Sequence, residues 1–418
     1  MVWYVVAIVA VAFFFDFING FHDSANSIAT IVGTRVLSPL AAVFWAATFN
    51  FAALFTGGVA VAKTVGGGMI EQSIVDPHVI LGGLLGAIIW NLITWVYGIP
   101  SSSSHALIGG YAGSAMAKAG LGAITWGPKW VQTLSFIVIS PLVGFLAGFG
   151  LMIACYWIFK ALNASRIDHV FRPAQLLSSA MLSYSHGGND AQKTMGIILG
   201  LLVASNSSFV NETGLLRHFY VPDMSTIPTW VEVGAYSMIS LGTLFGGWRI
   251  VHTMGSRITK LRPIGGFAAE TGGAIAIQLA THWGIPVSTT HTITGAIVGV
   301  GATNRLSAVR WGLAGRIVWA WVFTIPAAGI VRIQAQTIRP ASPQRTAESR
   351  FVAPTPTIAP VIVCVVLTGI PQWVASWMAI APPVSAANPP IGRSFVMREP
   401  IVWTMRQPPN SVPSEIIE

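Results

Sequence analysis

Long apolar runs limit most strongly how this chain can fold. Crossing the hydrocarbon core of a bilayer takes a helix of about 20 apolar residues. Runs of this kind lie near residues 2–21, 39–62, 79–97, 131–159, 174–205, 231–248, 264–283 and 306–329. Strands of a membrane barrel would instead be segments of about 10 residues with alternating polarity. The sequence therefore predicts an all-α polytopic membrane protein.

Composition excludes the alternatives to a membrane fold. Only 9% of the 418 residues are charged, against about 25% in an average soluble protein. So few charges cannot cover a globule of this size, and the many apolar residues exclude disorder over most of the length. The net charge of +9 comes mainly from short loops and forms no patch, so no nucleic-acid partner is expected. Cys155 and Cys364 lack the spacing of a metal site, and we expect neither a dedicated metal nor a cofactor.

Basic loops predict the orientation of the chain, because Lys and Arg are enriched on the cytoplasmic side. Two loops are predicted to be cytoplasmic, one with Lys160, Arg166 and Arg172 and the other with Arg249, Arg257, Lys260 and Arg262. The polar connection 206–229 carries only Arg217 and is expected outside. Counting back places the N-terminus outside, provided that the short segment 98–118 moves the chain across the membrane once.

An internal repeat is the most specific pattern in the sequence. Residues 98–105 are GIPSSSSH and residues 284–291 are GIPVSTTH. Each His is followed four residues later by a glycine, Gly109 in the first copy and Gly295 in the second. Both segments are too short to span a bilayer on either side of the proline. We therefore expect two re-entrant or broken hairpins whose Ser/Thr ends meet near the bilayer midplane.

A second, weaker match lies upstream of each hairpin. Residues 20–26 (GFHDSAN) pair with residues 187–193 (GGNDAQK), which aligns Asp23 with Asp190. By the loop charges, the first helix crosses inward and the helix with the second motif crosses outward. Inverted repeats with interrupted hydrophobic segments are typical of secondary transporters, whose site lies at the repeat interface. The predicted organisation is a first repeat at 1–160, a cytoplasmic linker at 161–173, a second inverted repeat at 174–330 and a proline-rich tail at 331–418.

The tail differs in composition from the rest of the chain. Of the 25 prolines, 14 lie within residues 340–418, and the stretch 332–350 is polar without helical period. Residues 358–381 are apolar again but contain two prolines. The sequence leaves three alternatives for this part: a poorly ordered tail, one further irregular membrane segment, or a change of reading frame.

The paired carboxylates are candidates for binding a cation or a proton. A carboxylate inside the bilayer costs several kcal/mol unless it has a partner, and Asp23 and Asp190 both lie in apolar runs. The amides of Asn26 and Asn189, with unwound backbone carbonyls, would complete a set of hard oxygen ligands. Lys193, opposite Asn26 in the repeat, would neutralise one carboxylate or approach an anionic substrate. The alternative is a capping Asp at each interfacial helix end.

The hairpins are candidates for binding an anion. A proline at the first turn, followed by hydroxyls, leaves free N–H groups at a helix end that favours phosphate-like anions. The hydroxyls are those of Ser102, Ser103, Ser104, Ser288, Thr289 and Thr290. Ser/Thr hydrogen bonding between membrane helices is the alternative.

Three further residues rank second. His105 and His291 either hold the hairpins by hydrogen bonds or titrate near neutral pH. Glu270, in FAAETGGA, is an intramembrane candidate for proton or ion coupling. An enzymatic role for Ser104–His105 or Thr290–His291 is not expected, because adjacent helical residues point about 100° apart and form no nucleophile–base pair.

With these motifs the sequence resembles the inorganic phosphate transporter (Pit) family, and its bacterial branch in particular. The resemblance runs from residue 1 to about 328 through NGFHDSANSIAT, GIPSSSSHALIGG, SHGGNDAQKTMG, GIPVSTTHTITG and AWVFTIPAA, in the family order. The pattern ends after Ala328, where the family continues with an intact last helix. The connection 206–229 is shorter than the hydrophilic insertion of some members.

The resemblance implies a multi-pass symporter of the plasma (cell inner) membrane that takes up inorganic phosphate, and a homodimer. It implies proton coupling, with phosphate free or as a neutral metal complex, while other branches use sodium. It places cation binding on Asp23, Asn26, Asn189 and Asp190 and phosphate binding on the six hairpin hydroxyls. A transporter of another oxyanion such as sulfate, or a channel, are the competing interpretations.

Overall fold

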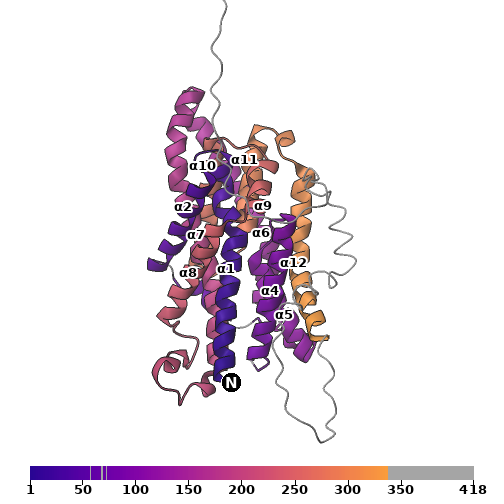
Figure 1. The fold of residues 1–418 in the computed structure, drawn as a ribbon. Helices are drawn as coiled ribbons and strands as arrows, with labels where there is room; N and C mark the ends of the chain where they lie inside the picture. Colours follow the sequence, from indigo (N-terminus) through magenta and orange to yellow (C-terminus); the bar gives the residue numbers. More distant parts are fainter. Residues whose placement is uncertain (57, 67–68, 72, 338–418) are drawn as a thin grey trace, which may run out of the picture. The chain divides into compact units, whose positions relative to one another are not determined.

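The structure is a computed structural model, and it describes residues 1–56, 58–66, 69–71 and 73–337. The described part is helical, apart from one isolated β-bridge between Ile70 and Ile124. Its α-helices (Figure 1) are α1 (Val2–Gly33), α2 (Pro39–Ala52), α3 (Ala60–Gly66), α4 (Pro77–Tyr97), α5 (Ser103–Ala119), α6 (Pro128–Phe159), α7 (Ala164–Ala204), α8 (Thr229–Phe245), α9 (Trp248–His252), α10 (Pro263–His282), α11 (Thr289–Asn304) and α12 (Trp311–Thr337). The predicted all-α class is confirmed for these residues, whereas the tail prediction for 338–418 lies outside them.

Seven of the eight predicted apolar runs each contain one α-helix, whereas the run 39–62 is divided between α2 and α3. These helices are not all equally suited to spanning a membrane. Among the described residues, four helices are long and apolar enough to cross a bilayer individually: α1, α4, α6 and α12. A fifth span results if α2 and α3, which are bent by 86°, count as one. The remaining runs form helices that are shorter or more polar.

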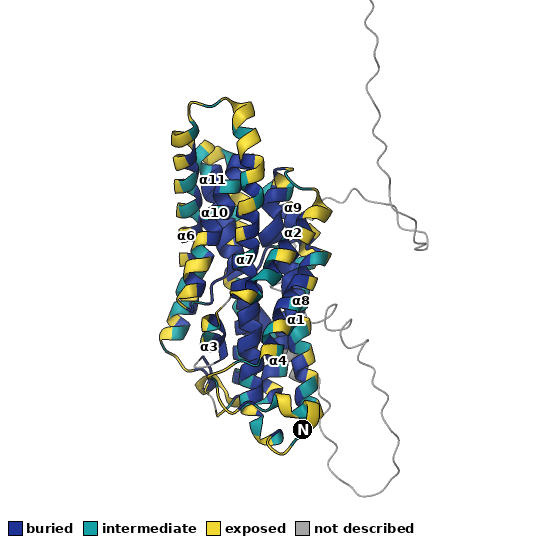
Figure 2. Cartoon of the chain, turned by 90° about the vertical axis from the view of Figure 1, so that its left-hand side faces the viewer, coloured by how far each residue is buried: buried dark blue, intermediate teal, exposed yellow. Residues whose placement is uncertain are grey.

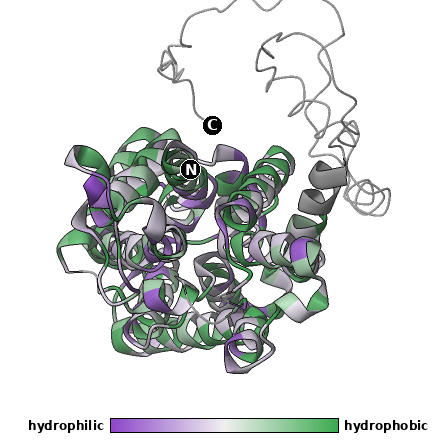
Figure 3. Cartoon of the chain, turned by 90° about the horizontal axis from the view of Figure 1, so that it is seen from below, coloured by the Kyte–Doolittle hydropathy of each residue, from purple (hydrophilic) through white to green (hydrophobic). Residues whose placement is uncertain are grey.

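The polarity of the bundle is inverted relative to a soluble protein. On α6, Val131, Leu134, Val138, Leu142 and Leu146 form an exposed apolar stripe, visible as yellow positions along this helix in Figure 2. Seen along the helices, apolar residues cover many outward faces (Figure 3). Meanwhile Asp16, Asp23, Asp190, Lys193 and Glu270 are buried. Lipid is the solvent that favours this arrangement.

The two halves of the chain pack in the same pattern. Helix α5 packs on α4 and α12, and α11 packs in the same way on α10 and α6. The matched glycines of the repeat explain how closely these helices approach. A Cβ atom on Gly109 would lie 2.3 Å from the Ile325 carbonyl oxygen of α12, and one on Gly295 would lie 2.1 Å from the Pro141 carbonyl oxygen of α6.

The chain breaks at matching places before α5 and α11. Gly98 (φ 64°) and Gly284 (φ 67°) adopt the left-handed conformation after α4 and α10, which costs least for glycine. A proline follows two residues later in each copy, and Ser102 and Ser288 then serve as N-caps of the new helices. Repeated sequence therefore produces repeated geometry: a helix, a short extended segment and a second helix.

The motifs around Asp23 and Asp190 do not interrupt their helices. We expected unwound backbone carbonyls there, and this is wrong: α1 and α7 are continuous through both motifs. The glycines instead permit close helix contacts. A Cβ atom on Gly20 would lie 2.0 Å from the Ile239 carbonyl oxygen of α8, and one on Gly187 would lie 2.6 Å from the Asn50 carbonyl oxygen of α2.

The basic connections lie at one end of the bundle. Asp168, Lys260, Arg262 and Arg305 line a common pocket, and the turn between α6 and α7 is at that end (Figure 1). The N-terminus and the connection 206–228 lie at the opposite end. Helix α7 already begins at Ala164, so most of the expected linker 161–173 is helical.

Candidate functional site

Two helix N-termini meet inside the bundle. The rings of His105 on α5 and His291 on α11 have centroids 4.8 Å apart. Between these ends, Lys193 of α7 donates hydrogen bonds to Ser104 Oγ at 2.6 Å and to the Val287 carbonyl oxygen at 2.7 Å. Both helix ends carry partial positive charge from their free N–H groups. With the ammonium group they form a buried, electropositive region.

The hairpin hydroxyls fall into two groups. Ser102 and Ser288 accept hydrogen bonds from the backbone N–H groups of His105 and His291 at 3.2 and 3.3 Å, which caps the two helices. Each hydroxyl keeps its hydrogen for donation. Ser103 Oγ is buried and has no hydrogen-bond partner among the described residues. It is therefore free to bind a ligand.

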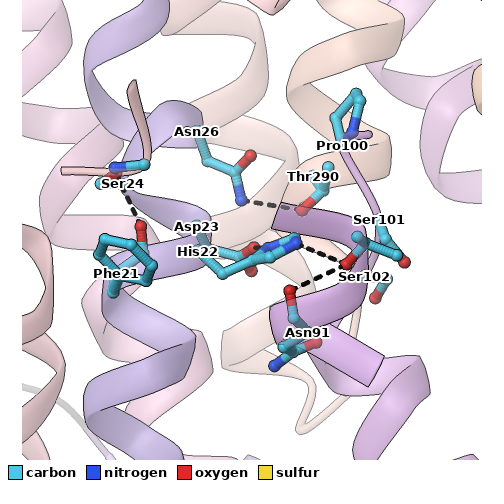
Figure 4. A network of polar contacts seen from close by, with 12 residues as sticks. Phe21, His22, Asp23, Ser24, Asn26, Asn91, Pro100, Ser101, Ser102 and Thr290 are labelled. Atoms are coloured by element: carbon cyan, nitrogen blue, oxygen red, sulfur yellow. Dashed lines mark hydrogen bonds and ion pairs between the residues drawn. The ribbon is translucent and has the colours of Figure 1, made fainter. Parts of the chain in front are cut away.

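Helix α1 contributes a histidine–carboxylate pair and an amide. His22 Nδ1 lies 2.7 Å from Asp23 Oδ1, and His22 Nε2 lies 2.9 Å from Thr94 Oγ1. The Asn26 amide donates to Thr290 Oγ1 at 2.9 Å and to Thr289 Oγ1 at 3.2 Å, 263 residues along the chain. Figure 4 shows His22 and Asp23 facing the turn before α5, with Asn26 reaching toward Thr290.

On α7, the carboxylate of Asp190 has more partners than that of Asp23 on α1. Lys193 Nζ donates to Asp190 Oδ1 at 2.5 Å, and His186 Nε2 lies 3.3 Å from Asp190 Oδ2. Thr289 donates to the same oxygen at 3.2 Å. The sequence left open whether Lys193 neutralises a carboxylate or approaches an anionic substrate; in the structure it pairs with Asp190 and also contacts both hairpins.

The carboxylates of the two halves converge with one histidine. Ligand atoms of Asp23, His186 and Asp190 all lie within 4.8 Å of one another, close enough to hold a metal ion. Sequence reasoning missed His186. The available signal was its spacing, because a residue four positions before Asp190 lies on the same face of a helix.

The remaining predicted residues lie around this centre. Asn189 donates to Thr281 Oγ1 at 2.8 Å, at the end of α10, and its Oδ1 has no partner among the described residues. The His291 ring stacks on Trp321 with centroids 4.0 Å apart. The His291 ring also interacts with the backbone of Ile137 on α6.

Glu270 belongs to a separate polar cluster. Its carboxylate accepts hydrogen bonds from Thr30 at 2.6 Å, Gln175 at 2.9 Å and Ser178 at 2.5 Å. These residues come from α1 and α7, and none of them is a predicted site residue. The structure therefore does not bring Glu270 into contact with the carboxylates or the hairpins.

Comparison with known proteins adds the family context. A model described as the phosphate transporter family matches residues 19–332. A probable low-affinity inorganic phosphate transporter of Rhizobium meliloti is 56% identical over 326 residues, covering 78% of this chain and 93% of that protein. A protein of the same description from Bacillus subtilis is 45% identical over 330 residues, covering 77% and 92%.

A solved structure described as the sodium-dependent phosphate transporter has the same fold. It matches with a TM-score of 0.69 at 24% identity and covers 80% of this chain and 99% of its own. The apolar helices, the extent of the family match and the identity to curated relatives lead to one assignment, which agrees with the resemblance found in the motifs. The chain is a membrane protein that belongs to the phosphate transporter family.

Proposed function

We propose that this protein is a secondary active symporter that takes up inorganic phosphate with protons across the cell inner membrane. One observation carries the proposal: two capped helix N-termini converge on a buried ammonium group, beside two carboxylates. Helix N-termini bind phosphate-like anions, and Lys is a common partner of phosphate. Family membership makes phosphate the first anion to test.

Each half of the site has a role in this proposal. Phosphate binds at the hydroxyls of Ser102, Ser103, Ser104, Ser288, Thr289 and Thr290, with Lys193 as a counter-charge. Cation binding involves Asp23, Asn26, Asn189 and Asp190. Asp23, His186 and Asp190 lie close enough to hold the metal of a neutral metal–phosphate complex, if phosphate enters in that form.

Alternating access between two inverted repeats would give transport. Three features support a two-fold relation between 1–160 and 174–330. Both copies have a left-handed glycine before the hairpin helix and a serine at its N-cap, and α5 and α11 pack on corresponding helices. Opposite membrane orientation of the two copies follows from the loop charges. A homodimer remains part of the proposal on the resemblance alone.

Sodium coupling is the second candidate, because the solved structure of this fold is described as sodium-dependent. Phosphate uptake into proteoliposomes with an imposed pH or sodium gradient separates the two. Accumulation driven by the pH gradient without sodium supports proton coupling, whereas a strict requirement for sodium overturns it. Competition by arsenate but not by sulfate would identify phosphate as the oxyanion, since arsenate matches its charge and shape.

A further inference from the structure

Two buried carboxyl groups of the described residues lie outside the cluster of site residues, Glu270, whose partners are given above, and Asp16. Asp16 of α1 is fully buried, and its Oδ1 accepts a hydrogen bond from Thr194 of α7 at 2.8 Å. Its Oδ2 has no hydrogen-bond partner among the described residues. The amide of Asn19, one turn along α1, interacts with the same carboxyl group. Neither of these partners carries a charge.

The lack of a cationic partner distinguishes Asp16 from the other two carboxylates of this region. Asp23 has His22, and Asp190 has Lys193 and His186. Within the described residues, no Lys, Arg or His forms an ion pair with Asp16. An ionised carboxylate buried without a counter-charge is so unfavourable that the group takes up a proton instead.

Charged and titratable groups face Asp16 from two neighbouring helices. From α7, Asp190 and Lys193 act on it with opposite sign, so that their pair contributes little net charge. From α8, Tyr236 interacts with Asp16, and the Tyr236 hydroxyl also interacts with Gln192 of α7 and with Glu232. On α1 itself, the closest such groups along the chain are His22 and Asp23. None of these supplies a free positive charge.

We propose that the Asp16 carboxyl, held by Thr194, is the site that binds the proton carried with phosphate. This rests on the proposed proton-coupled uptake. Asp16 keeps the proton while its surroundings are closed and releases it when water reaches the carboxyl group from the inside.

Coupling to phosphate follows from position on α7. Thr194 is adjacent to Lys193, whose ammonium group connects the two hairpin ends. A phosphate anion bound there would use the positive charge of Lys193 and leave Asp190 less compensated. Added negative charge in a region of low dielectric favours the neutral form of Asp16. Phosphate binding and proton binding therefore support each other.

Asp16→Asn tests the proposal, because it keeps the shape of the side chain and removes the titrating group. In proteoliposomes we expect loss of phosphate accumulation driven by a pH gradient, while phosphate–phosphate exchange at equal pH persists. Asp223→Asn, on the exposed connection before α8, is the matched control and should accumulate phosphate like the wild type. Accumulation by Asp16→Asn at the wild-type level would overturn the assignment.

Two further measurements keep the test decisive if Asp16→Asn does not fold. Thr194→Val removes the donor that favours the ionised form, so the pH dependence of uptake should shift to higher pH, and no shift would count against the proposal. Infrared spectroscopy should show a protonated carboxyl band that is lost as the pH rises. The band should remain in Glu270→Gln, which removes the other buried carboxyl group of the described residues without an ion-pair partner, and its absence from Glu270→Gln would overturn the assignment. If the wild type showed no uptake driven by a pH gradient, the proposed function would fail, while the infrared band of Glu270→Gln would still decide whether a buried carboxyl group other than Glu270 holds a proton.

Discussion

The two carboxylates of the site, one in each half of the chain, are neutralised in different ways. Asp23 on α1 has the neighbouring His22 at 2.7 Å. Asp190 on α7 has the ammonium group of Lys193 at 2.5 Å and His186 at 3.3 Å. The repeat places Asn26 where the second half has Lys193. One half therefore has a lysine beside its carboxylate, and the other does not.

This difference indicates which half of the site depends on the coupling ion. A histidine is charged only when protonated, so the neutralisation of Asp23 depends on conditions or on an added cation. The Lys193 side chain contacts Asp190 and both hairpins, so no external cation is needed beside Asp190. Dependence on the coupling ion should therefore be concentrated on the α1 half, and the predictions below test this division.

Removing Lys193 should have the largest effect. Lys193→Met leaves Asp190 buried without its ammonium partner, and breaking a buried ion pair costs about 3–5 kcal/mol of stability. We expect a lower unfolding temperature in detergent and no phosphate uptake. Lys63→Met, at an exposed position on α3, is the control.

A double variant sharpens the same comparison. Lys193→Met with Asp190→Asn removes both charges, so part of the lost stability should return while transport stays absent. A Lys193→Met protein as stable as the wild type would show that the ion pair does not hold the second half together.

Asp23→Asn should separate transport from stability. The substitution removes a carboxylate whose partner is the neighbouring His22 and leaves no lysine unpaired, so the cost to folding should be below that of Asp190→Asn, which strands the Lys193 ammonium group. We expect both variants to lose coupled uptake, with normal thermal unfolding only for Asp23→Asn. Equal destabilisation of the two would contradict the division between the halves.

The sequence predicted the parts of the site that lie in local patterns. The self-match identified the two hairpins, and the weaker match aligned Asn26 with Lys193. The sequence did not identify Thr94, which lies 72 residues from His22 along the chain and contacts it in the fold. Such contacts depend on helix packing. The glycines beside Asp23 and Asp190 suggested unwound backbone, but Gly20 and Gly187 instead allow neighbouring helices to approach. A glycine that allows close packing and one that permits a break have the same letter.

Removing single hydroxyls at the two hairpin ends should have smaller effects than removing a charge, and these effects should differ between the two hairpins. Ser103→Ala removes a hydroxyl without a partner among the described residues, so stability should hold while phosphate binding weakens. A hydrogen bond to a charged group contributes about 1.5–3 kcal/mol, which corresponds to a KM for phosphate raised by about tenfold or more.

Thr289→Val on the other hairpin should also affect folding, because this hydroxyl links Asn26 and Asp190. Uptake kinetics and thermal unfolding of both variants measure the difference. A KM for phosphate unchanged in Ser103→Ala would exclude this hydroxyl from the phosphate site.

The smallest expected effect is on stability, and it concerns the helices that precede the two hairpins, α4 and α10. Helix α4 has a side-chain cap, because Asp76 accepts from the backbone N–H of Val79 at 2.8 Å, whereas the N-cap residue of α10, Arg262, provides no such hydrogen bond. Burial alone would raise the pKa of Asp76, but hydrogen bonds from Lys118 and Val79 outweigh it and hold the pKa below its usual value. A carboxyl group with a lowered pKa in the folded state stabilises above its ordinary pKa, and this contribution is lost as pH falls through the lowered value.

The pair of Asp76 and Lys118 is partly exposed, with side-chain exposures of 34% and 40%, so solvent screens it. Asp76→Ala should therefore cost at most about 1 kcal/mol near neutral pH, and the difference from the wild type should disappear in acid. Asp76→Asn keeps a capping oxygen and should lose less. Thermal unfolding of the three proteins from neutral to acidic pH measures this, and a difference that grew as the pH fell would reverse the sign and refute the assignment.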